Sequence, residues 1–173
     1  MSKKFKDRIE IFNDHAEIIL IDRKNNEKAR ALIGLEDVIR CKEYTWFLST
    51  RNYVLSKTQE GKNIKLHRFI MDILDKPKVI CDHIDRNPLN NQKNNLRLCT
   101  VKENKYNNSK QRNNTSGVVG VYWYKPYNKW KAQIKKDRKD IFLGYFNNFD
   151  EAVKVRKNAE IKYFGEFYPK DND

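Results

Sequence analysis

The alternation of apolar and polar residues predicts two strands and a helix in the middle of the chain. Residues 79–81 are a short apolar run typical of a buried strand, and residues 96–98 alternate as a second strand does. Turn-forming residues separate the two segments. Thr100, with Glu103 three residues later, forms the pattern of a capping box, which predicts a helix that carries Asn104.

The last third of the chain predicts a small sheet and one helix. Residues 120–123, 129–134 and 142–146 alternate with a period of two, and a helix is expected from Asp150, as its N-cap, to Phe164. The face that packs on the helix is expected to carry Val119, Val121, Trp123, Trp130, Ala132, Ile134, Ile141, Leu143 and Tyr145. The opposite face is expected to carry Tyr122, Tyr124, Lys131, Gln133, Lys135 and Phe142.

The N-terminal part carries a less regular pattern. The expected elements are strands at 17–21 and 29–33, a short helix at 35–41, a strand pair at 46–48 and 53–55, and a helix at 66–73. The fold class is therefore α+β. We expect an N-terminal α+β unit at 1–104, a basic linker at 105–116, and a domain at 117–168 made of a three-stranded antiparallel sheet packed on one helix.

The charge balance indicates a polyanionic partner. The 173 residues include 36 Lys and Arg against 23 Asp and Glu, which gives a formal net charge of +13. A protein of this charge displaces counterions from nucleic acid when it binds. Charge alone does not separate a nucleic-acid enzyme from a basic protein without a specific partner, so the decision depends on the site residues.

The sequence does not indicate export or membrane insertion. Charged residues from Asp7 to Glu10 interrupt the apolar core that a signal peptide needs, and no apolar stretch approaches membrane-spanning length. Cys41, Cys81 and Cys99 lack Cys-x-x-Cys spacing, so neither a disulfide framework nor a structural zinc is expected. The expected compartment is the reducing cytoplasm of a bacterium or of a phage-infected host cell.

One segment holds the residue types that phosphodiester hydrolysis needs. A histidine, whose ordinary pKa is near neutrality, can deprotonate water. A hard divalent cation neutralises the phosphate and takes oxygen ligands from carboxylates and carboxamides. Asp82 and His83 are adjacent, and Asn95 and Asn104 follow them. Neighbouring side chains of a strand leave opposite faces, so Asp82 and His83 are expected to have separate tasks.

This segment resembles the HNH endonucleases of the phage and intron homing type. The resemblance covers residues 81–91, 94–100 and 103–104 almost position by position. Upstream, Leu66-His67-Arg68 resembles the Leu-His-Arg segment of the family, in which the histidine supports structure. Arg86 stands where the family often has Gly, which argues against a tight left-handed turn there but can place a cation near phosphate.

The resemblance implies a ββα-metal unit with its core at about 79–107 and a role for each of four residues. Asp82 and Asn104 would bind one divalent cation, with Mg²⁺ expected and Mn²⁺ as the alternative. His83 would be the general base that activates water. Asn95 would orient the His83 ring.

The C-terminal sheet and helix resemble the ethylene-response-factor (APETALA-type) DNA-binding domain of plants, which also occurs fused to HNH endonucleases. The resemblance is carried by Gly120-Val121, Lys129-Trp130, residues 143–146, Glu151-Ala152 and Phe164-Gly165. It implies that the outer face of the sheet reads the major groove. Residues in three regions are expected to contact DNA. They are Arg97 of the predicted nuclease unit, Lys110 and Arg112 of the linker, and, on the sheet, Tyr122, Tyr124, Lys131, Gln133 and Lys135.

These features together predict a metal-dependent HNH DNA endonuclease that hydrolyses a phosphodiester in duplex DNA. Nicking and double-strand cleavage both remain open, as do a monomer and a homodimer. The resemblance favours a homing or mobile-element role. The alternative from another class is a non-catalytic, sequence-specific DNA-binding regulator, and cleavage of a supercoiled plasmid separates the two.

Overall fold

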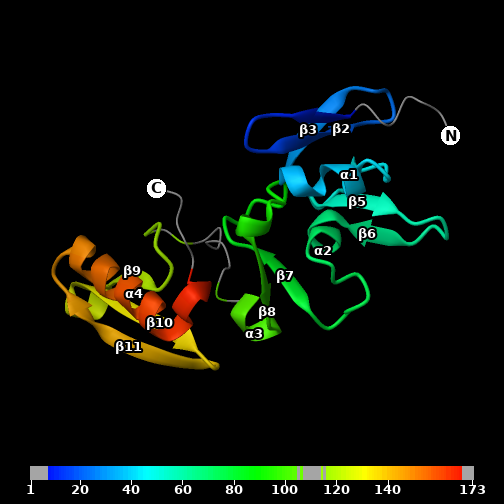
Figure 1. Ribbon diagram of the computed structural model, residues 1–173. Coiled ribbons are helices and arrows are strands. Elements are labelled where there is room, and N and C mark those ends of the chain that lie inside the picture. The colour runs from blue at the N-terminus through cyan, green and yellow to red at the C-terminus, as the bar shows by residue number, and fades with distance from the viewer. Residues whose placement is uncertain (1–7, 105, 107–113, 115, 169–173) are drawn as a thin grey trace. The chain divides into compact units, whose positions relative to one another are not determined.

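The fold is mixed α+β, as predicted, and contains several small antiparallel sheets with short helices (Figure 1). The computed structural model describes residues 8–104, 106, 114 and 116–168. The chain divides into two compact units, Met1–Val101 and Lys102–Lys170. Within the described ranges, no helix is both long enough and apolar enough to cross a membrane.

The first unit contains two three-stranded sheets that share one hydrophobic core. The first sheet is β1 (Ile9–Ile11), β2 (Ala16–Ile21) and β3 (Glu27–Ile33), and the second is β4 (Phe47–Leu48), β5 (Val54–Lys57) and β6 (Asn63–Lys65). Between them lie the 3₁₀ turn η2 (Leu35–Asp37) and α1 (Val38–Cys41). The fully buried core side chains include Leu20, Ile33, Val54, Leu66 and Ile70. The sequence pattern did not predict β1 and β6, which have three residues each.

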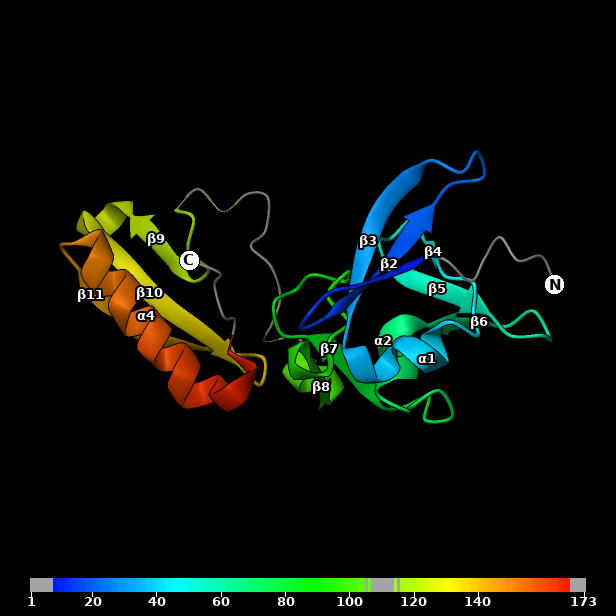
Figure 2. The ribbon, with the colours of Figure 1, turned by 45° about the horizontal axis from the view of Figure 1, so that its top comes forward.

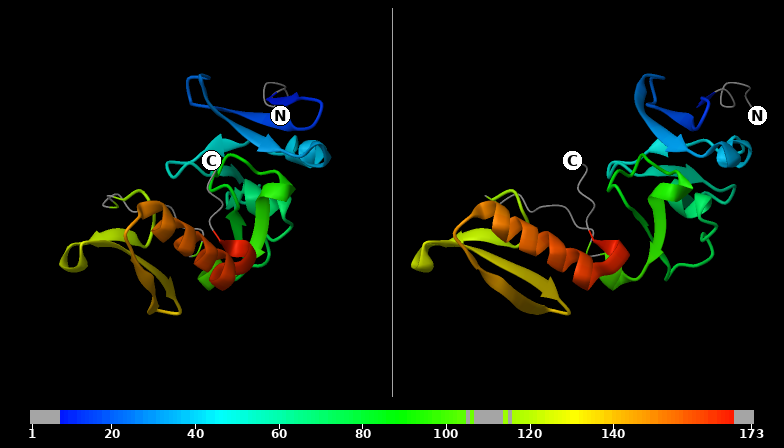
Figure 3. Two further views of the ribbon diagram at one scale, coloured as in Figure 1. Left: turned by 90° about the vertical axis from the view of Figure 1, so that its left-hand side faces the viewer. Right: turned by 60° about the vertical axis from the view of Figure 1, so that its left-hand side comes forward.

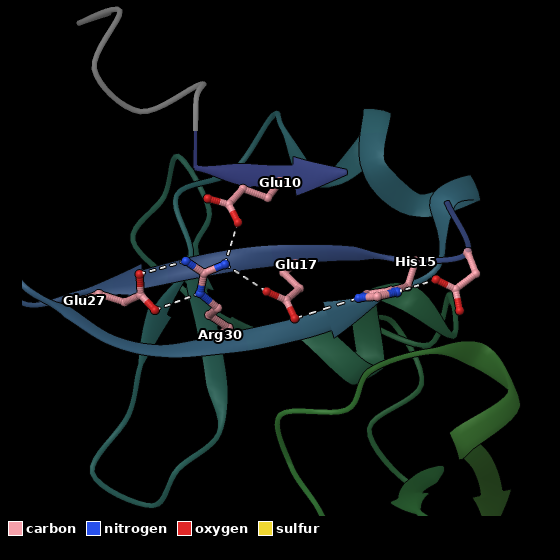
Figure 4. Close-up of polar contacts among 6 residues, drawn as sticks. Glu10, His15, Glu17, Glu27 and Arg30 are labelled. Carbon is pink, nitrogen blue, oxygen red and sulfur yellow. Dashed lines mark hydrogen bonds and ion pairs between the residues drawn. The ribbon is translucent and has the colours of Figure 1, made fainter. Parts of the chain in front are cut away.

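An ion-pair network covers the solvent side of the first sheet (Figure 4). Arg30 of β3 binds Glu10, Glu17 and Glu27, which come from β1, β2 and β3. His15 contacts Asp14 and, at 3.8 Å, Glu17. The network ties the exposed faces of the three strands together.

The helix α2 (Leu66–Ile70) leads into the middle region and packs against β5 and β6 (Figure 2). It ends three residues earlier than the predicted helix. Arg68 binds the segment that follows the helix. Its guanidinium donates to the backbone carbonyls of Val79, Ile73 and Lys76 at 2.6, 2.6 and 2.8 Å. The Arg68 side chain therefore binds the loop between α2 and the next strand at three points.

The predicted strand, strand and helix follow in the expected order. β7 (Ile80–His83) pairs with β8 (Leu96–Cys99) in an antiparallel ribbon, and α3 (Val101–Asn104) begins directly after Thr100. Within β8, Leu96 is buried in the core, whereas Leu98 is exposed. The apolar run, the alternation and the capping pattern therefore predicted the order of these three elements correctly, although Leu98 does not share the burial of Leu96.

The second unit has a three-stranded sheet with one long helix along one face (Figure 3). The strands are β9 (Val121–Tyr124), β10 (Lys129–Lys136) and β11 (Lys139–Phe146), and the helix is α4 (Phe149–Phe164). The short turns η4 (Lys125–Tyr127) and η5 (Gly165–Phe167) follow β9 and α4. The N-cap of α4 is Asn148 rather than the predicted Asp150, because the Asn148 side chain accepts from the Asp150 amide.

The two faces of this sheet differ from the prediction at Tyr145. A β-bulge shifts the pairing of β10 with β11 between Ala132 and Gln133, and Gly144 adopts a φ of +138° there. Tyr145 consequently contacts the rings of Tyr124 and Phe142, on the face away from α4. The assignment of Tyr145 to the core face is wrong because an uninterrupted alternation does not account for the bulge.

Candidate active site

Asp82 and Arg97 face each other across the β7–β8 ribbon. They are direct register partners, and Arg97 donates from Nε and Nη2 to Asp82 Oδ2 at 3.2 and 2.9 Å. The side chains are 13% and 11% exposed, so solvent screens the pair only weakly. Arg97, expected to contact DNA, thus holds the expected metal ligand in this structure.

His83, the next residue of β7, points to the opposite side and is buried, with 5% of its surface exposed. Burial lowers the pKa of His83 below its ordinary value, and a hydrogen bond to Asn91 and the charges of Asp85 and Asp82 oppose that effect. The imidazole is therefore neutral near pH 7. A neutral imidazole can accept a proton, which is the state that a general base requires.

Two rings from other parts of the first unit lie near the His83 ring. His67 of α2 lies edge-on to it with ring centroids 5.0 Å apart, and Tyr53 lies 6.4 Å away by the same measure. Burial, with smaller effects of the same sign from His83 and Lys65, lowers the pKa of His67 to about 3. The Leu-His-Arg segment thus places its leucine in the core, its histidine against His83, and its arginine on the loop before β7.

Asn95, the residue expected to orient the His83 ring, binds the loop between β7 and β8 with its side chain in this structure. Asn95 Nδ2 donates to Asp85 Oδ1 at 2.9 Å and to the Asn90 carbonyl at 2.8 Å, and its Oδ1 accepts from the Asp85 amide. The Asn95 carbonyl also accepts from the Ile84 amide. These bonds close the loop between β7 and β8, so Asn95 acts on the loop as a whole.

Arg86 in this loop adopts a left-handed conformation, with φ at +63°. The expectation of no such turn is therefore wrong. The Arg86 amide donates to the His83 carbonyl, and the Asn87 amide donates to Asp85 Oδ1. These two bonds impose the tight turn on an arginine, for which the left-handed region costs on the order of 1–2 kcal/mol.

The loop is also attached to the first sheet, and the sequence pattern gave no sign of this contact. Leu32 of β3 donates to the Leu89 carbonyl and accepts from the Asn91 amide, each at 2.8 Å. Asn91 is 1% exposed, and its Oδ1 lies 3.4 Å from His83 Nε2. Asn91, one of several asparagines in this loop, therefore places a polar atom beside the His83 ring.

The oxygen donors expected for a divalent cation come from both ends of the ββα segment. Asp82 lies in β7, and Asn104 is the half-buried last residue of α3, past the boundary between the two units. Among the described residues, no group of three or more His, Cys, Asp or Glu side chains is placed to hold a metal. Two protein oxygens supplemented by water and substrate suit Mg²⁺, which usually keeps several waters.

The expected DNA-contacting residues of the second unit share the sheet face away from α4. Lys131 Nζ lies 5.6 Å from the ring centroids of both Tyr122 and Tyr124 and 5.9 Å from that of Phe142. The Tyr122 hydroxyl donates to Gln133 Oε1 at 3.3 Å, and Lys135 is exposed farther along β10. The face combines lysines with several aromatic rings. The expected linker contacts, Lys110 and Arg112, lie outside the described residues.

Comparisons with known proteins agree with the segment that contains Asp82 and His83. A family model described as HNH endonuclease matches residues 74–106. An uncharacterized HNH endonuclease, L560, of Acanthamoeba polyphaga mimivirus is 30% identical over 141 residues, which are 79% of this chain and 72% of that protein. Protein 3.8 of Escherichia phage T7 is 43% identical over 58 residues, 34% of this chain and 48% of that protein. No solved structure gives a significant match.

Proposed function

Since this chain belongs to the HNH endonuclease family, we propose that it is a divalent-metal-dependent endonuclease that hydrolyses a phosphodiester of duplex DNA. One observation carries the proposal. His83 is buried and neutral, and Asp82, the preceding residue of the same strand, points to the opposite side. The arrangement provides a proton acceptor and an oxygen donor from consecutive residues, on separate faces.

His83 is the general base of this proposal. Its low exposure keeps bulk water away from the ring. In this proposal, the substrate holds the attacking water against the small exposed part of the imidazole, and His83 deprotonates that water. Neutrality near pH 7 makes the ring competent to accept the proton without a further change.

Asp82 and Asn104 are the proposed ligands of the cation. Their donors are a carboxylate and a carboxamide oxygen, the kind that hard cations prefer, and Asp82 is held in a single orientation by Arg97. A bound Mg²⁺, or Mn²⁺ as the alternative, would stabilise charge on the scissile phosphate and on the leaving oxygen. The products implied by the family are 5′-phosphate and 3′-hydroxyl ends.

The second unit is the proposed DNA-binding part, in line with its resemblance to the ethylene-response-factor domain. Its outer sheet face offers rings that can contact bases or sugars and Lys131 and Lys135 for phosphates. The net charge of +13 supports the same assignment. Arg97, and Lys110 and Arg112 in the linker, would add phosphate contacts. A homing or mobile-element role is the biological proposal.

Incubation of the purified chain with supercoiled plasmid and Mg²⁺, with and without EDTA, tests the proposal. We expect relaxed or linear plasmid only when free Mg²⁺ is present. His83→Ala should lower cleavage by at least about 10²-fold while DNA binding stays near that of the parent. The matched control is His15→Ala, because His15 contacts Asp14 and Glu17 on the first sheet. Binding without any cleavage would overturn the proposal in favour of the DNA-binding regulator.

A further inference from the structure

The Asn91 side chain meets the His83 ring in an environment that excludes solvent. Asn91 is 1% exposed and His83 is 5% exposed. The distance of 3.4 Å between Oδ1 and Nε2 is long for a hydrogen bond, as is common for catalytic contacts before substrate binds. Water has little access to compete for either group.

The other end of the Asn91 carboxamide determines which of its atoms faces the ring. Asn91 Nδ2 donates to the Pro88 carbonyl at 3.2 Å. A carbonyl oxygen only accepts, so the amide nitrogen has to point toward Pro88. The carboxamide oxygen therefore points toward His83, and it too can only accept.

We propose that Asn91 is a positioning residue that fixes the tautomer of the His83 base. Because Oδ1 accepts, His83 Nε2 carries the proton, and the acceptor lone pair of the neutral ring lies on Nδ1. A base in the other tautomer would present an N–H where it has to receive a proton. This inference rests on the proposed function for its catalytic consequence, but the tautomer itself does not.

The backbone of Asn91 supports this role. Its amide donates to the Leu32 carbonyl at 2.8 Å, and an isolated parallel bridge joins Leu32 to Asn90. Asn91 is thereby held at two points, its backbone by the edge of β3 and its carboxamide by Pro88. A side chain fixed in this way keeps one rotamer and offers its oxygen in one direction.

The test records the imidazole ¹⁵N resonances of the full chain without metal at about pH 8, above the ordinary pKa of histidine. His83→Gln identifies the resonances of His83. We expect Nε2 to be protonated in the parent, and Asn91→Leu to give a mixture or the Nδ1–H form. Under Mg²⁺, Asn91→Leu should lower kcat on plasmid by on the order of 10²-fold, with the Kd for DNA little changed. Asn91→Asp, which keeps an acceptor oxygen, should retain the parent tautomer.

Asn90→Leu is the matched control, because Asn90 binds Asp85 from the same loop. It should keep the Nε2–H tautomer even where loosening of the loop slows cleavage. An Nδ1–H form in the parent, or an Asn91→Leu protein with the parent tautomer and kcat, would overturn the inference. A parent with the Nε2–H tautomer but no cleavage under any metal would instead refute the proposed function and leave the tautomer assignment standing.

Discussion

The rings of His67 and His83 meet edge to face, with their centroids 5.0 Å apart and their planes at 78°. Both residues are 5% exposed. A proton on either ring would place a cation in a nearly dry environment beside the other, so the resting pair favours two neutral rings.

Acid should therefore destabilise the protein through His67. Its pKa is about 3 in the folded chain and about 6.5 in the unfolded chain, so the unfolded state binds more protons between these values. Stability then falls as the pH decreases below about 6.5, by about 2 kcal/mol at pH 5. His67→Phe, which keeps a ring in the core, should lose this part of the pH dependence. Urea unfolding at a series of pH values measures it.

The control for this experiment is His15→Gln, which removes a histidine from the surface of the first sheet and should leave the pH dependence close to that of the parent. If the free energy of unfolding depends on pH in the same way for the parent and for His67→Phe, His67 is not buried in its neutral form.

Removal of the Arg97 charge should lower the Mg²⁺ concentration that cleavage requires. Arg97 donates twice to Asp82 Oδ2, and its charge repels a cation that approaches the same carboxylate. For Arg97→Gln we expect the Mg²⁺ concentration for half-maximal cleavage to fall by about three- to tenfold, equivalent to roughly 1 kcal/mol. DNA affinity should fall moderately, because one positive charge is lost.

Arg23→Gln, at an exposed position in the turn between β2 and β3, makes the same charge change away from Asp82 and serves as the control. A metal requirement for Arg97→Gln that equals or exceeds that of Arg23→Gln would count against Asp82 as a ligand.

Gly120 should tolerate no side chain. Its φ is +79°, and a Cβ there would lie 2.3 Å from the Gln133 carbonyl oxygen and 2.7 Å from Arg156 Nε. The Gln133 amide donates to the Gly120 carbonyl, so the two backbones cannot separate easily. Gly120→Ala should destabilise the second unit by about 3 kcal/mol or more, as measured by thermal or urea unfolding.

Gly117 provides the comparison, because its φ is +77° and nothing lies within 4 Å of an added Cβ. Gly117→Ala should cost only about 1 kcal/mol, the conformational part of the penalty. Equal losses for the two variants would show that the contact with Gln133 is not the cause.

The sequence predicted the ββα elements because their signals are local. The apolar run before Asp82, the alternation around Arg97 and the capping pattern at Thr100 each depend on a few neighbouring residues. The same holds for β10, β11 and α4. The three-residue strands β1 and β6 are too short for a period-two pattern to stand out from the surrounding loops.

The details of the site depend on contacts that no local pattern records. Asn91 and Asn95 are both asparagines of one loop, and contacts with Leu32 and Pro88 direct Asn91 to the His83 ring. Arg86 takes a left-handed turn because bonds from its neighbours impose it. Tyr145 changes face because of a bulge that alternation alone cannot reveal.

The attachment of the β7–β8 loop to Leu32 has a consequence for protein engineering. A transplant of residues 74–106 into another scaffold would carry Asp82, His83 and the loop asparagines. It would leave behind the edge of β3, which binds the Asn91 backbone, and the His67 ring of α2, which packs against His83. A graft that is meant to retain cutting activity therefore has to include these two distant supports or replace them with equivalents of its own.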